Sequence, residues 1–187
     1  MYKPDEIEQK IVSAIIIRDM QIGVSYNVYP YKGAPEEATI YRADKPHEDF
    51  REAVRPIADI AKKWLEMDLI NAARKDLHMS IVKIKYVESS KHGSGVKLTC
   101  SVSGLKYSDE SIKLGTPTYY LGGCGSGTDQ HGLEYTKQQL TDNQYSIFKK
   151  LADEAFKYAY YGKREQPTVT EAAQAAENGG FADEEGK

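Results

Sequence analysis

The chain has 187 residues, 40% apolar and 28% charged with a net charge of −3, which is typical of one globular domain. No apolar run approaches the roughly 20 residues that span a bilayer, and the N-terminus has no secretory signal pattern, so we expect a cytoplasmic protein. Two cysteines make no disulfide framework, and a pI near 5.9 excludes a global basic footprint for nucleic acid, which leaves only a local patch.

The first segment is compatible with two structures. Pro4 followed by two acidic residues is typical of a helix start, and apolar residues then recur at helical spacing as far as Ile15. The β-branched run over residues 12–17 favours a strand instead. A short helix leading into a strand and one long strand both fit this pattern.

A hairpin and a helix are expected next. Strict apolar-polar alternation over residues 20–29 predicts a strand, and turn residues 30–35 separate it from a second strand over 38–43. Asp44 is the expected N-cap of an amphipathic helix that extends to Trp64, with Pro56 expected to kink it or remove one backbone bond. A further helical piece is predicted over residues 68–75.

The second half predicts more strands and a closing helix. Strands are expected over residues 79–87, 96–103, 112–116 and 119–121, joined by short turns and therefore antiparallel. The glycine-rich stretch 122–132 is interpreted as a flexible connector, although successive backbone N–H groups there could also cradle an anion. Thr141 with Gln144 matches a capping box, and the helix that follows should end before Gly162.

Together these elements predict an α+β domain over residues 1–163, with an antiparallel sheet of about five strands and helices on one face. Residues 164–187 hold six acids and two basic residues, a net charge of −4, and are expected to form a disordered tail. Within the tail, an aromatic-acidic cluster is a candidate partner-binding motif; the alternative is a solubilising end. The cluster consists of Phe181, Asp183, Glu184 and Glu185.

Catalytic and metal-binding patterns are missing from the sequence. It has no Gly-Lys-Ser/Thr loop, no dinucleotide fingerprint, no Cys-x-x-Cys pair and no Gly-x-Ser-x-Gly elbow. Cys100 falls on the apolar side of a predicted strand, where a buried, inert thiol is the ordinary outcome. We therefore expect a non-enzymatic protein without catalytic residues, metal or cofactor.

Basic and aromatic residues alternate through the predicted sheet. They could follow a phosphate backbone and stack on bases, or simply form a solvated face. The candidate nucleic-acid-binding residues are Lys83, Lys85, Tyr86, Lys97, Lys106, Tyr107 and Lys113. The excess of tyrosine, 14 against 4 Phe and 1 Trp, also has two interpretations: half-buried rings on sheet faces and helix flanks, or a contact surface.

A resemblance adds to this hypothesis. The region of residues 94–164 resembles small uncharacterised proteins of tailed-phage early or replication gene clusters. The resemblance is carried by the segments GVKLTCSVSGLKYSDESIKLGTPTYYL and EAFKYAYYGKREQ, residues 95–121 and 154–166. The tail is similar in layout to the acidic tips of single-stranded-DNA-binding proteins, although Phe181 is not C-terminal. The resemblance implies a binding protein of a replication or recombination module, with single-stranded nucleic acid and a protein as partners. The alternative is a protein-interaction module, or a phage inhibitor of a host enzyme, with a tyrosine-rich contact surface.

Overall fold

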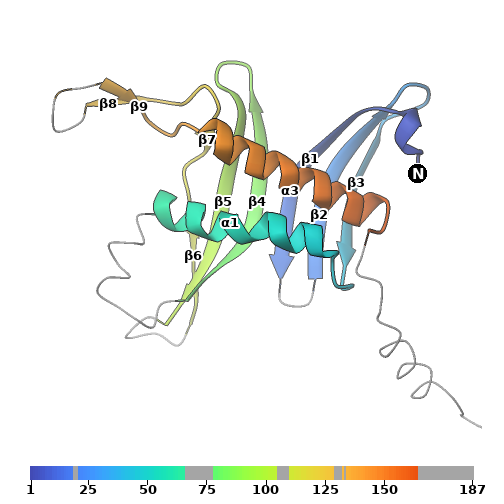
Figure 1. The fold of residues 1–187 in the computed structure, drawn as a ribbon, viewed down its shortest axis with the longest axis horizontal. Helices are drawn as coiled ribbons and strands as arrows, with labels where there is room; N and C mark the ends of the chain where they lie inside the picture. Colours follow the sequence, from blue (N-terminus) through green and yellow to red (C-terminus); the bar gives the residue numbers. More distant parts are fainter. Residues whose placement is uncertain (19–20, 66–77, 105–109, 129–131, 133, 164–187) are drawn as a thin grey trace, which may run out of the picture.

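The computed structural model describes residues 1–18, 21–65, 78–104, 110–128, 132 and 134–163. These residues form an antiparallel sheet and two helices, which confirms the α+β class (Figure 1). The helical piece expected over 68–75 and the acidic tail lie outside the described residues. The elements, in chain order, are η1 (Pro4–Glu6), β1 (Ile7–Arg18), β2 (Gln21–Pro30), β3 (Glu36–Arg42), α1 (Glu48–Trp64), β4 (His78–Ser89), β5 (Gly93–Ser103), β6 (Ile112–Gly115), β7 (Tyr119–Tyr120), β8 (Ser126–Thr128), β9 (Glu134–Thr136) and α3 (Asp142–Tyr160).

The main sheet has seven strands instead of about five, in the order β3-β2-β1-β4-β5-β6, and β7 pairs with β5 beyond the end of β6. Strands β8 and β9 form a separate hairpin, so part of the stretch interpreted as a flexible connector is paired. Short pairings of this kind leave little trace in the sequence, because two or three residues are too few to show a period.

Strand β1 settles the ambiguity at the N-terminus. A short 3-10 turn, Pro4–Glu6, leads into a 12-residue strand that pairs with both β2 and β4. A register shift between Val12 and Ala14 marks a bulge at Ser13. The bulge sends Val12 and Ile15 to the same face, although they are three residues apart.

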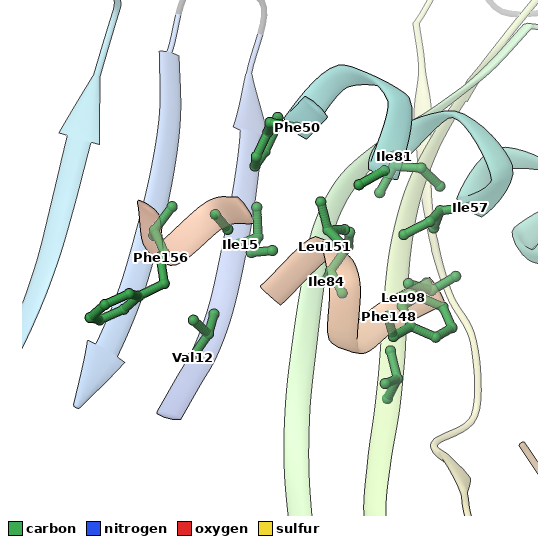
Figure 2. Packing of buried hydrophobic residues seen from close by; sticks show 14 of the residues in the cluster. Val12, Ile15, Phe50, Ile57, Ile81, Ile84, Leu98, Phe148, Leu151 and Phe156 are labelled. Carbon is green, nitrogen blue, oxygen red and sulfur yellow. The ribbon is translucent and has the colours of Figure 1, made fainter. Parts of the chain in front are cut away.

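Two helices cover one face of the sheet (Figure 1). They run antiparallel, because Phe50 near the start of α1 meets Tyr158 near the end of α3, with ring centroids 5.8 Å apart. At the other end of the pair, the ring centroid of Trp64 in α1 lies 5.7 Å from that of Phe148 in α3. Figure 2 shows side chains from both helices and from strands β1, β4 and β5 meeting in a single hydrophobic core.

The helix caps differ in how far they were predictable. The Thr141 capping box is confirmed, with Gln144 N donating to Thr141 Oγ1 at 3.2 Å. The Asp44 cap is wrong: α1 begins at Glu48, and His47 Nδ1 accepts from Asp49 N. Pro46 explains the shift, because a proline disfavours helical backbone in the residue before it. Pro56 lies inside α1, which continues through it.

Candidate nucleic-acid interface

The sheet face opposite the helices carries four exposed lysines. On β5, alternate residues such as Leu98 and Cys100 are buried in the core, whereas Lys97 between the buried positions is exposed. Lys85 is paired with Lys97 on the neighbouring strand, and Lys83 is paired with Thr99. Side chains of paired residues point to the same face. The exposed residues therefore define one surface, the lysine face, which consists of Lys83, Lys85 and Lys97 together with Lys113, the partner of Ser101.

The lysine face has little opposing charge. The pairing register places one acidic side chain, Glu37, among the described strand residues of this face, and it lies on β3 at the far edge. Arg18 of β1 adds another positive charge on the same face. No acid among the described residues forms a salt bridge with any of the four lysines.

Lys85 and Lys97 stand directly opposite each other on β4 and β5. Residues in such pairs have Cβ atoms about 5 Å apart, and like charges at this distance destabilise a sheet. A bound polyanion would remove this repulsion. Hydroxyl groups of Thr99 and Ser101 lie beside the lysines on the same face, and each is half-buried.

Of the other predicted site residues, only Tyr86 is among the described residues, and it does not join this surface. Tyr86 lies on the opposite face of β4, where its hydroxyl donates to the carbonyl oxygen of Phe148 in α3 at 2.9 Å. Burial is the main cause that raises the pKa of the Tyr86 hydroxyl, and the nearby Asp153 carboxylate raises it further. Lys106 and Tyr107 lie outside the described residues, as do the tail residues Phe181, Asp183, Glu184 and Glu185.

Two tyrosines on the exposed face were not among the predicted site residues. Tyr41 of β3 is paired with Gly23, and Tyr120 of β7 is paired with Gly95. Each ring occupies the space in which a side chain at the glycine would lie. The sequence signal was weak, because a tyrosine and a glycine on different strands become neighbours only through the register.

Strands β1 and β4 diverge next to this surface. They pair only through residues 14–16 and 83–85, although each strand has 12 residues. Beyond the pairing lies a cleft of about 470 Å³, lined by residues of both strands and of α3, including Val12, Tyr86 and Phe148. Lys10 of β1 forms a salt bridge to α3 beside this cleft, with its Nζ 2.9 Å from Asp153 Oδ1.

The remaining candidate chemistry is accounted for by local contacts. The backbone N–H groups of Gly122, Gly123 and Cys124 donate to carbonyl groups at residues 92, 120 and 137, so they are not free to cradle an anion. Burial raises the pKa of the Cys100 thiol to about 11, in agreement with the expected inert thiol. Within the described ranges, no three His, Cys, Asp or Glu side chains are placed to hold a metal ion.

Comparisons with known proteins add no relative. No family model matches the chain, and neither a curated protein nor a solved structure matches it. Neither described helix is long and apolar enough to cross a membrane.

Most tyrosines are part of the packing. Of those whose exposure is described, only Tyr31, Tyr41 and Tyr161 are exposed, and the others are half-buried or buried on sheet faces and helix flanks. This distribution favours the packing interpretation of the tyrosine excess over a single tyrosine-rich contact surface.

Proposed function

We propose that this chain is a non-enzymatic, phage-type accessory protein that binds single-stranded nucleic acid through the lysine face, in a replication or recombination module. The observation that carries the proposal is the direct pairing of Lys85 with Lys97, without an acidic partner among the described residues. Lys83 lies two residues from Lys85 on β4, and Lys113 lies on β6 opposite Ser101. A phosphate backbone supplies closely spaced negative charges that match such a row of cations.

The exposed position of the lysine face on the sheet favours an extended strand over a small ligand. Small-molecule sites are concave and largely apolar, whereas the lysine face is an exposed sheet surface of lysine, threonine and serine side chains. Lysine contacts are made to phosphates and carry no sequence information, so we expect weak binding with little sequence preference.

The acidic tail is proposed to modulate this binding. A tethered segment with a net charge of −4 competes for a cationic surface at high effective concentration. Deletion of residues 165–187 should therefore strengthen binding to an oligonucleotide at low salt. A tail whose removal leaves affinity unchanged has no role in competition and would act only on solubility or on a protein partner.

Fluorescence anisotropy with a labelled single-stranded oligonucleotide tests the proposal. Each phosphate contact contributes about −0.7 to the slope of log K against log salt for single strands. Replacing Lys83 and Lys97 with Gln should thus make the slope about 1.4 less negative and weaken binding. The matched control replaces Lys63 of α1 and Lys150 of α3, which are exposed on the helical layer.

Equal losses in the lysine-face variant and the control would show that only net charge matters, and would contradict a specific face. Absence of any binding at low salt would refute the proposed function. Capture of one stoichiometric protein partner, together with no oligonucleotide binding, would instead support the alternative of a protein-interaction module.

A further inference from the structure

Each of two glycines on the exposed face supports a tyrosine ring from a neighbouring strand. A Cβ atom built on Gly23 would lie 2.5 Å from Cε1 of Tyr41, and one built on Gly95 would lie 2.5 Å from Cδ1 of Tyr120. Contacts this short show that each ring lies across the backbone of its glycine partner. Tyr41 is 47% exposed and Tyr120 is half-buried, so each ring keeps surface toward solvent on which a nucleic-acid base could stack.

The surroundings of the two rings are suited to a nucleotide. The guanidinium carbon of Arg18 lies 5.7 Å from the centroid of the Tyr41 ring, within cation–π distance. The Arg18 guanidinium group supplies a cation for a phosphate, or a second plane for stacking. The His92 ring lies 5.4 Å from the Tyr120 ring and is tilted by 38°. Both sites therefore combine a ring with a second planar or cationic group.

Three lysines of the lysine face lie on strands between the two rings. Tyr41 is on β3, at one edge of the sheet, and Tyr120 is on β7, beside β5 near the other edge. Five steps between neighbouring strands, at about 4.8 Å each, give a separation of at least about 24 Å. Strands β4 and β5, with Lys83, Lys85 and Lys97, fall within this span.

We propose that Tyr41 and Tyr120 are base-stacking platforms that anchor a single strand running across the sheet, with its intervening phosphates on the lysine face. This inference rests on the proposed function and defines its ligand: an unpaired strand, because a base within a duplex has no free face to stack. At about 3.4 Å per stacked nucleotide, at least about seven nucleotides are needed to reach from one ring to the other.

The test compares a base-bearing oligonucleotide with an abasic deoxyribose-phosphate oligomer of equal length. Tyr41→Leu and Tyr120→Leu should each weaken binding of the base-bearing strand about tenfold. Neither variant should change binding of the abasic oligomer, and Tyr→Phe at either position should retain affinity. Tyr31→Leu is the control, since Tyr31 is 66% exposed in the turn between β2 and β3.

A length series separates one anchor from two. Affinity should rise steeply once the strand exceeds about seven nucleotides, and that rise should vanish in either Leu variant. If both Leu variants bind the base-bearing strand as the wild type does, while the Lys83 and Lys97 variant binds weakly, the platforms are refuted and the proposed function stands. If wild-type protein binds neither oligomer, the proposed function itself is refuted.

Discussion

Glu154 connects the two helices through a charge network and should make the fold sensitive to acid. The residue is only 7% exposed, and its carboxylate accepts from Lys157 Nζ at 2.6 Å and from Lys163 Nζ at 3.0 Å. Lys163 also forms an ion pair with Asp49 of α1. Burial by itself would raise the pKa of Glu154, but the two lysine hydrogen bonds outweigh it, and the pKa lies below its ordinary value.

The direction of this pKa change fixes the sign of the pH dependence. A carboxyl group with a lower pKa in the folded state stabilises the fold above its unfolded pKa, about 4.3 for Glu, and this contribution is lost as pH falls through the folded pKa. Glu154→Gln removes the negative charge and replaces one of the two accepting oxygens with an amide nitrogen that cannot accept. We expect it to lower the free energy of unfolding by about 1.5–3 kcal/mol at neutral pH.

Urea unfolding followed by circular dichroism, at neutral pH and again below about pH 4, measures the effect. The gap between the wild type and Glu154→Gln should narrow as the pH falls through the lowered pKa of Glu154, because the wild-type carboxyl group then becomes protonated in the folded state. Asp153→Asn is the control: this acid is the next residue, pairs with Lys10 and is 43% exposed, so its replacement should cost less than about 1 kcal/mol. A gap that is the same at both pH values would refute this account of Glu154.

Two further predictions concern single residues. In the native protein a thiol reagent should label Cys124 and spare Cys100, which is fully buried. In urea both cysteines should react. Equal labelling rates of the two cysteines in the native protein would contradict the burial of Cys100. Gly95→Ala should destabilise the fold by about 1–3 kcal/mol, because its Cβ would also lie 3.0 Å from the rigid carbonyl oxygen of Tyr119. The three atoms nearest to a Cβ at Gly23 all belong to the Tyr41 side chain and not to backbone, so Gly23→Ala should cost less in a thermal melt.

Local pattern was sufficient for much of this fold. The apolar stripe of α1, the capping box of α3 and the alternation in β2 and β5 each require only neighbouring residues, and all three are present in the structure. Alternation likewise separated Lys97 from the buried Leu98. It also implied that Tyr86 and Lys85, which are adjacent on one strand, point to opposite faces.

The bulges set the limit of that reasoning. On β4 a register shift between Ile81 and Lys83 sends Ile81 into the core and Lys83 to the exposed face, although strict alternation would put both on one face. A bulge is fixed by the pairing of two strands, not by the residues of one, so the sequence of β4 alone does not reveal it.

The sequence by itself determined the α+β class, the cap of α3 and a lysine-rich polar face, because these follow from periodicity along the chain. Only the tertiary structure decided that Lys85 opposes Lys97 and that Tyr41 and Tyr120 lie across Gly23 and Gly95. These relations join residues of different strands. They depend on strand order and register, which are set by how the whole sheet packs on its two helices.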